Sequence, residues 1–315
     1  MRILVIGGGF ISRHLVTQLV SFDHDVTLLC RSTDSELKKV SYAQGDIRDV
    51  ERVERVIQTV NPEAIFCLAA FKDRKQTTPE AIREAIEVNV LGTSTVLGAC
   101  VPLTSLKSIV VLGTAEEYGV ASAAPFDETQ RERPLTAYTL SKTCQTHLCQ
   151  TYAKSYNLPI VVLRPTVVYG PGQGLEMFLP ALIVSLLKGA AFKMTAGEQK
   201  RDYLHIKDLI RAMTLAVSAR CVPGEIINVG YGESMRLAQI ADRVAQLIGR
   251  PDLLKLGALP YRHGEVFEYV TCIKKAARVL NWAPAVDLNA GLQSTVSYYQ
   301  STVADGAAEF AVNSL

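Results

Sequence analysis

Short apolar runs alternate with amphipathic stretches through about the first 165 residues, and this alternation restricts the fold more than any other feature of the sequence. Strands buried on both faces are short and rich in Val, Ile and Leu, whereas helices repeat apolar residues at three- and four-residue intervals. The alternation predicts an α/β fold with a doubly wound parallel sheet of the Rossmann type and right-handed crossovers. The predicted strands lie at 2–6, 25–30, 40–44 (the weakest), 64–68, 107–112 and 159–164, and the predicted helices at about 10–21, 49–59, 80–100 and 136–156.

The pattern loosens after a break of glycine and proline at 170–174. We expect a sheet domain over 1–170, to which a segment at about 201–222 returns, and a smaller, mainly substrate-binding region over 171–302. Residues 303–315 lack periodicity and are predicted to form a mobile tail. Further helical patterns follow the break at about 176–188, 206–218, 236–248 and 287–300.

Composition excludes several classes of protein. The 315 residues contain 33 Lys and Arg against 31 Asp and Glu, a formal charge of +2, so the basic excess that nucleic-acid binding needs is absent. No apolar run approaches the roughly 18–20 residues of a membrane span, and no signal peptide is expected before the first strand. Seven cysteines without a CxxC pair predict reduced, buried thiols and a cytoplasmic protein, and the scattered histidines predict no metal site.

A glycine turn follows the first strand and opens the first helix. Gly7-Gly8-Gly9-Phe10-Ile11-Ser12 fits the spacing G-x-G-x-x-G, with Ser12 in the third glycine's place. The first glycine permits a tight turn, the second lets the backbone approach a pyrophosphate, and the helix N-terminus supplies N–H donors. In this strand–turn–helix context the motif predicts a dinucleotide site.

The end of the second strand distinguishes the two nicotinamide dinucleotides. An NAD site places Asp or Glu there to bind the adenosine ribose, but this strand ends Cys30-Arg31-Ser32. Arg31, with Ser32, suits a 2′-phosphate instead. The sequence therefore favours NADP(H) and leaves NAD(H) possible.

A tyrosine and a lysine at helical spacing form the predicted catalytic pair. Tyr138 and Lys142 lie on one face of the helix predicted at 136–156, and a nearby ammonium lowers the pKa of a phenol. Thr114 follows the strand predicted at 107–112, at the sheet edge where ligands bind. Its hydroxyl is placed to hold the oxygen whose proton Tyr138 handles.

Together these motifs resemble the extended short-chain dehydrogenases/reductases, in particular the branch of nucleotide-sugar epimerases, dehydratases and reductases. The resemblance runs from Met1 to about Tyr299. It rests on the glycine turn and Tyr138-x-x-x-Lys142, and on further motifs: Gly45-Asp46-Ile47, Leu68-Ala69-Ala70, Asn89-Val90-Leu91-Gly92-Thr93, Tyr118-Gly119, Arg164-Pro165, Tyr169-Gly170-Pro171-Gly172, Arg201-Asp202-Tyr203-Leu204-His205, Gly224-Glu225, Asn228-Val229-Gly230, Arg262-x-Gly264-Glu265 and Trp282-x-Pro284.

The resemblance implies roles for individual residues. Thr114, Tyr138 and Lys142 would be the catalytic hydroxyl, tyrosine and lysine, with Lys142 also holding the nicotinamide ribose. Arg201 and Arg262 would hold the diphosphate of a nucleoside-diphosphate sugar, and His205 would contact substrate or merely pack. The implied cofactor-binding residues are Gly7, Gly9, Phe10, Ile11, Arg31, Ser32, Asp46, Ile47, Leu68, Ala69, Ala70, Lys72, Asn89, Tyr138, Lys142, Pro165, Val167 and Val168. The relatives also lead us to expect a homodimer built on the helix that begins near 80 and the helix carrying Tyr138.

The segment Thr114-Ala115-Glu116-Glu117 bears on the reaction. Dehydratases of the family carry an acid or hydroxyl where Ala115 stands, although Glu116 is kept. The segment is more similar to that of reductases of GDP-4-keto-6-deoxy-mannose, and NADPH suits a reductase. We therefore favour NADPH-dependent reduction of a nucleoside-diphosphate 4-keto-6-deoxy sugar. Two alternatives stay open: a 4,6-dehydratase or epimerase with bound NAD(P) and Glu116 as base, and a non-catalytic dinucleotide-binding scaffold.

Overall fold

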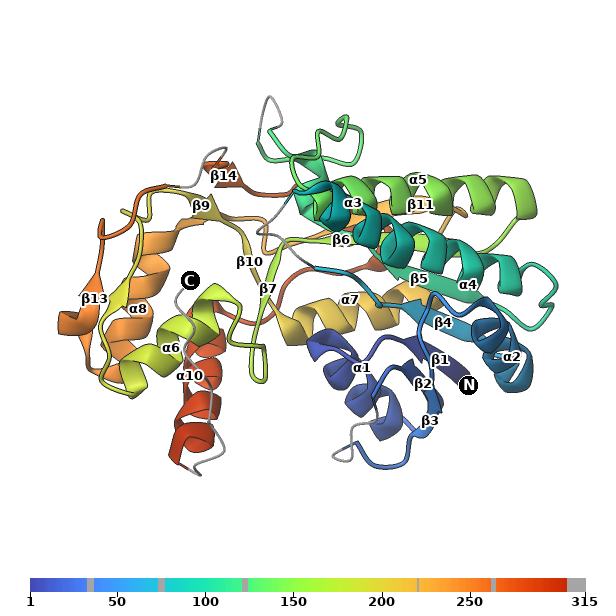
Figure 1. Cartoon of the computed structure of the whole chain (residues 1–315), viewed down its shortest axis with the longest axis horizontal. Coiled ribbons are helices and arrows are strands. Elements are labelled where there is room, and N and C mark those ends of the chain that lie inside the picture. The colour runs from blue at the N-terminus through green and yellow to red at the C-terminus, as the bar shows by residue number, and fades with distance from the viewer. Residues whose placement is uncertain (33–36, 73–76, 121–123, 220, 262–264, 305–315) are drawn as a thin grey trace.

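The chain forms two lobes of unequal size, with a parallel sheet and its covering helices in the larger one (Figure 1). The computed structural model describes residues 1–32, 37–72, 77–120, 124–219, 221–261 and 265–304. The larger lobe contains β1 Arg2–Ile6, α1 Phe10–Ser21, β2 Asp25–Cys30, β3 Ser41–Gln44, α2 Val50–Val60, β4 Ala64–Cys67, α3 Pro79–Ala85, the π-helical segment η1 Ile86–Leu91, α4 Gly92–Cys100, β5 Ser108–Leu112, the 3₁₀ turn η2 Ala115–Tyr118, α5 Ala137–Tyr156, β6 Ile160–Pro165, α7 Ile206–Ser218, β11 Glu225–Val229 and α9 Lys274–Leu280.

Seven parallel strands form the central sheet in the order β11-β6-β5-β4-β1-β2-β3. The order reverses between β1 and β4, since the chain first runs outward to β3 and then crosses back to β4. In open α/β sheets, ligands bind at the carboxyl ends of the strands beside such a reversal. The glycine turn follows β1, so the fold sets it beside this crevice.

Alternate residues of each strand pack into two separate cores. Leu4, Ile65 and Val111 belong to the core beneath α2, α4 and α5, whereas Val5 and Phe66 face the core beneath α1, α7 and α9. Both faces of the sheet are therefore covered, and this explains why the strand sequences are continuously apolar rather than alternating.

The smaller lobe has its own hydrophobic core. It is made chiefly by three helices that pack on one another: α6 Phe178–Leu187, α8 Leu237–Ile248 and α10 Leu288–Ala304. They lie at one end of the molecule, away from the sheet (Figure 1). The elements of this lobe and of the connection to it are β7 Val167–Tyr169, α6 Phe178–Leu187, β8 Phe192–Lys193, β9 Lys200–Arg201, β10 Tyr203–His205, β12 Met235–Arg236, α8 Leu237–Ile248, η3 Pro251–Leu253, β13 Leu254–Lys255, β14 Glu268–Tyr269 and α10 Leu288–Ala304.

The structure confirms the predicted fold class and departs from the sequence analysis at three places. The helix predicted over 80–100 is three consecutive segments, because η1 widens to a π-helix in the middle. A seventh strand, β11, joins the sheet, although the sequence suggested only a short extended piece there. Residues 303 and 304, expected in a mobile tail, continue α10, and the rest of that tail lies outside the described residues.

Candidate functional site

Two hollows meet at the carboxyl edge of the sheet, and they share Gly9, Leu68, Ala70 and Lys72. The first has a volume of about 440 Å³, within the usual range of small-molecule sites. Ten of the residues predicted to bind the cofactor line it: Gly7, Gly9, Arg31, Ser32, Asp46, Ile47, Leu68, Ala69, Ala70 and Lys72. The second is lined by the predicted residues Gly9, Phe10, Ile11, Leu68, Ala70, Lys72, Thr114, Tyr138, Lys142, Pro165, Val167 and Val168.

The glycine turn fits a dinucleotide pyrophosphate. Gly7 has a φ of +110°, and a Cβ there would lie 2.7 Å from the backbone nitrogen of Ala69. A Cβ at Gly9 would meet no atom within 4 Å, and Gly9 lines both hollows, so the space over it is open to a ligand. Gly9 is also the N-cap of α1, whose free N–H groups favour an anion.

Charged side chains line the first hollow at the end of β2. Arg31 and Ser32 follow Cys30, the last residue of that strand, and they are the residues described at this end of β2. Asp46 and Arg48 come from the next loop and form an ion pair, with 2.8 Å between Oδ2 and Nη2. The hydrogen bond from Arg48 lowers the pKa of Asp46 to about 2, so Asp46 is ionised at neutral pH. Sequence analysis did not single out Arg48, although it stands two residues after Asp46.

Asn89 lies behind the first hollow rather than in its lining. It is fully buried in η1, and its amide accepts from the Phe71 N–H (2.7 Å) and donates to the Phe71 carbonyl (3.1 Å) and to Ser141 Oγ (2.8 Å). Its polar atoms are thus used within the protein, and it holds the loop that carries Lys72. Predicted as a cofactor-binding residue, Asn89 shapes the hollow from outside.

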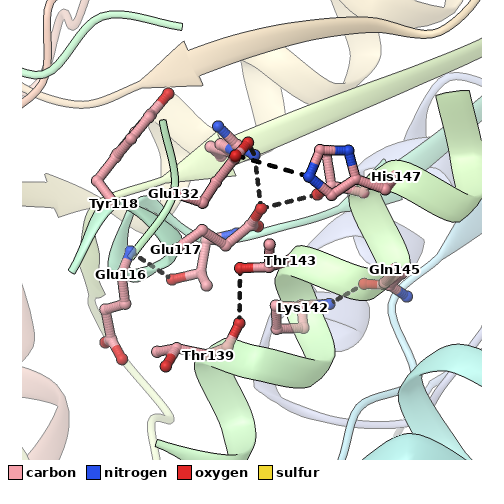
Figure 2. Close-up of polar contacts among 12 residues, drawn as sticks. Glu116, Glu117, Tyr118, Glu132, Thr139, Lys142, Thr143, Gln145 and His147 are labelled. Atoms are coloured by element: carbon pink, nitrogen blue, oxygen red, sulfur yellow. Dashed lines mark hydrogen bonds and ion pairs between the residues drawn. The ribbon is translucent and has the colours of Figure 1, made fainter. Parts of the chain in front are cut away.

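Thr114 caps the 3₁₀ turn that follows β5. Its Oγ1 accepts from the backbone N–H of Glu116 at 3.3 Å, so the hydroxyl proton is left to donate into the second hollow. The side chain is buried, and the contact fixes its orientation. The same turn directs Glu116 and Glu117 in different directions (Figure 2).

Tyr138 and Lys142 both lie in the first turns of α5 and line the second hollow with Thr114. Lys142 Nζ donates to the Leu112 carbonyl and to Gln145 Oε1. Burial lowers the pKa of Lys142, and the negative charge of Glu117 opposes that shift. The arrangement brings a hydroxyl, a phenol and an amine to the second hollow, where they can exchange a proton with a substrate oxygen.

The sequence model described as the NAD dependent epimerase/dehydratase family matches residues 3–230. The chain belongs to this family. It is 27% identical to human dTDP-D-glucose 4,6-dehydratase over 95% of this chain and 90% of that protein. It is also 28% identical to a putative UDP-glucose 4-epimerase of Methanocaldococcus jannaschii, over 95% of this chain and 98% of the other.

Solved structures of an epimerase and a dehydratase share the fold over nearly all of this chain. UDP-glucose 4-epimerase of Thermotoga maritima, solved with UDP-glucose, has a TM-score of 0.87 at 26% identity and covers 96% of this chain and 99% of its own. A dTDP-glucose 4,6-dehydratase variant of Streptomyces venezuelae, solved with NAD, also scores 0.87 at 26% identity, over 96% of this chain and 98% of its own. The matches confirm the resemblance to the extended short-chain dehydrogenases/reductases, and so the prediction of an enzyme.

The two arginines that the family resemblance implied for the substrate diphosphate are Arg201 and Arg262. Arg201 is already paired with Glu265 and also donates to the carbonyls of Lys200 (2.8 Å) and Val266 (2.7 Å). Its guanidinium lies over the Tyr269 ring, 5.3 Å from the centroid. Arg201 lines neither hollow, and Arg262 lies outside the described residues.

His205 is a capping residue in the core. Its side chain is 2% exposed, and its Nδ1 accepts from the Lys207 N–H at the start of α7. The ring packs against Tyr169, with 5.3 Å between centroids, and burial lowers its pKa to about 4. Of the two roles expected for His205, substrate contact and packing, this geometry matches packing.

Sequence analysis missed several polar residues of the second hollow. These are Thr166, Gln173 and Glu176, which line it together with Tyr138 and with Ser12 of the glycine motif. Gln173 is nearly buried and donates to the Val168 carbonyl at 2.8 Å. The break at 170–174 was the available signal, because loops that interrupt a regular pattern often carry binding residues.

Two predicted absences can be compared with the described part of the chain. There, no three His, Cys, Asp or Glu side chains gather closely enough to hold a metal ion. Across the same residues, no helix combines the length and apolar character of a membrane span.

Proposed function

We propose that the protein transfers a hydride at C4 of a nucleoside-diphosphate sugar, in the direction of NADPH-dependent reduction of a 4-keto-6-deoxy sugar. The observation that carries the proposal is the meeting of Thr114, Tyr138 and Lys142 at the second hollow, which opens into the hollow of the glycine turn. This geometry supports an enzyme over the non-catalytic scaffold, because a scaffold has no need of an oriented proton donor.

The protein's own residues would orient the substrate and supply the proton. When bound, the cofactor supplies the hydride. Thr114 would donate its hydroxyl proton in a hydrogen bond to the C4 carbonyl oxygen of the sugar. As a C–H bond forms at C4 and the carbonyl π bond breaks, Tyr138 would give its phenolic proton to that oxygen, and Lys142 would stabilise the resulting phenolate.

The absence of an acid at Ala115 supports reduction over dehydration. A 4,6-elimination needs a base for the C5 hydrogen and an acid for the departing C6 hydroxyl. Glu116 offers one carboxylate, whereas Ala115 is 3% exposed and brings no acid. Hydride transfer alone needs neither group.

The adenosine end of the first hollow supports NADP(H). Arg31 and Ser32 line it where an NAD site would place a carboxylate, and Asp46 is already paired with Arg48. A guanidinium and a hydroxyl suit the three acceptor oxygens of a 2′-phosphate.

A 4-epimerase with retained NAD is the second candidate. It uses the same three catalytic residues and likewise has no need of an acid at Ala115. The structure of Bacillus cereus UDP-glucuronic acid 4-epimerase, a relative at 25% identity, was solved with NAD, and this favours the alternative.

The family resemblance also leads us to propose a diphosphate site at Arg201 and Arg262, and a homodimer. The dimer proposal is supported by Leu91 and Leu140, which are exposed at 57% and 37% on the helices expected to pair. No disulfide joins any of the seven cysteines, which supports a reducing, cytoplasmic location.

Two measurements test the proposed function. Mass spectrometry of the natively purified protein reports any retained dinucleotide, and incubation with NADPH and a nucleoside-diphosphate 4-keto-6-deoxy sugar reports turnover. We expect one NADPH oxidised for each ketone reduced. Retained NAD, together with no NADPH oxidation, would favour the epimerase.

A further inference from the structure

Glu117 is a fully buried carboxylate directly behind the catalytic hydroxyl. It follows Glu116 in the turn after β5, but its side chain points into the protein toward α5 and β6 (Figure 2). Removing a carboxylate from water costs several kcal/mol unless charges and hydrogen bonds replace the lost hydration. Such a group therefore requires an explanation that packing alone does not provide.

Both oxygens of Glu117 are bonded to elements that carry the site. Oε1 accepts from the backbone N–H of Thr114 at 2.9 Å. Oε2 accepts from Thr146 Oγ1 at 2.8 Å and lies 2.7 Å from Nη2 of Arg164. Thr146 stands one turn after Lys142 on α5, so one side chain ties the turn of Thr114 to the helix of Tyr138 and Lys142.

A second carboxylate, Glu132, completes the ion cluster from outside the turn of Thr114. Arg164 Nη2 lies 2.6 Å from Glu132 Oε1, and Glu132 approaches the exposed His147 at 3.6 Å. Glu117 and Glu132 therefore share one guanidinium, but Glu117 bonds to Thr114 and to the buried Thr146 of α5, whereas Glu132 meets α5 at the exposed His147. The chain itself thus offers a matched control for each test of Glu117.

We propose that Glu117 is a positioning residue, which sets Thr114 against the helix of Tyr138 and Lys142. This inference rests on the proposed hydride-transfer function. Glu117 favours the charged amine against its burial, as the pKa of Lys142 reflects. The other titratable groups acting on Lys142 are Cys67, Cys149 and Lys72, and of these only Lys72 is ordinarily charged at neutral pH.

The first test compares Glu117→Gln with Glu132→Gln in the full-length protein. For Glu117→Gln we expect kcat to fall about 10- to 100-fold with KM within about threefold, because misplaced catalytic groups slow chemistry more than binding. The alkaline limb of kcat should move to lower pH, since the negative charge of Glu117 that favours protonated Lys142 is removed. Glu132→Gln should leave both quantities close to wild type. Equal kcat values and equal alkaline limbs in the two variants would overturn the proposal.

A second test needs no substrate and remains available if Glu117→Gln fails to fold. The paired change Glu117→Leu with Arg164→Met replaces the buried charges with apolar groups. We expect the Thr114 amide hydrogen to exchange at least about tenfold faster in this variant than in Glu132→Gln, because its acceptor is gone. Equal exchange rates would overturn the positioning role. A wild-type protein that turns over no nucleotide sugar would instead refute the proposed function, and the exchange result would still stand.

Discussion

Two ion pairs of nearly equal length stand at the two ends of the joined hollows. Arg48 and Asp46 approach to 2.8 Å at the adenosine end, and Arg164 and Glu117 to 2.7 Å behind the catalytic end. Their side chains differ in exposure: 42% and 29% in the first pair, and 0% and 0% in the second. The comparison shows that distance alone does not indicate what an ion pair does.

The exposure of each ion pair decides how it responds to a bound ligand or to the loss of one partner. Water screens the first pair, so its charges can rearrange around a ligand at small cost. The second pair is sealed, and loss of either partner leaves an uncompensated buried charge. The pKa of Asp46 is accordingly lowered by its partner, whereas burial raises the pKa of Glu117 despite Arg164. The proposed adenosine end is therefore adaptable, and the proposed catalytic end is held in one geometry.

The largest expected effect lies at the catalytic end itself. Tyr138→Phe removes the proton donor and keeps the ring, so kcat should fall roughly 10³-fold, as is typical for loss of general acid catalysis. NADPH affinity, measured by fluorescence titration, should stay within about twofold because the cofactor contacts in the first hollow are unchanged. Unchanged turnover of Tyr138→Phe would refute the mechanism.

The two ion pairs can be compared directly by the same substitution. Arg164→Met should lower the free energy of unfolding by about 3–5 kcal/mol, since Glu117 and Glu132 lose their shared cation. Arg48→Met should cost less than about 1 kcal/mol, because its pair is exposed. Urea denaturation of both variants measures the difference. Similar losses of unfolding free energy in the two variants would show that burial does not make the two ion pairs differ.

A third test asks what burial does to a titrating group without an ion pair. His205 has its pKa lowered to about 4, so between pH 6.5 and 4 the unfolded chain binds more protons than the folded one. This contribution to stability is present above pH 6.5 and is lost as the pH falls toward 4. His205→Asn keeps an acceptor for the Lys207 N–H and should gain roughly 2 kcal/mol relative to wild type between pH 7 and 4.5. Parallel pH profiles of unfolding free energy for the wild type and His205→Asn would contradict the lowered pKa of His205.

The smallest expected effect lies at the adenosine end. Arg31→Ala should weaken NADPH binding by roughly tenfold, the loss of one exposed charge-assisted contact, and change NADH binding by less than about twofold. Fluorescence titration with both cofactors measures the ratio. Equal weakening of the two would show that Arg31 does not discriminate the 2′-phosphate.

Local chemistry explains most of what could be predicted. The boundaries of α1 and α7 follow from apolar periodicity, and the glycine turn from residues that tolerate a positive φ at Gly7. The π-helical turn around Asn89 could not be predicted, because it depends on the contact with Phe71 in a distant loop.

The sequence alone determined the fold class and the glycine turn, and it singled out Thr114, Tyr138 and Lys142 as candidate catalytic residues, since each follows from spacing within one element or at its end. Tertiary structure alone decided that Glu116 and Glu117, adjacent and chemically identical, lie half-buried and fully buried. It also decided that His205 caps a helix in the core. The physical reason is that the burial and the bonding partners of a side chain depend on which strands and helices the fold places around it. No local sequence pattern around a single residue specifies those neighbours.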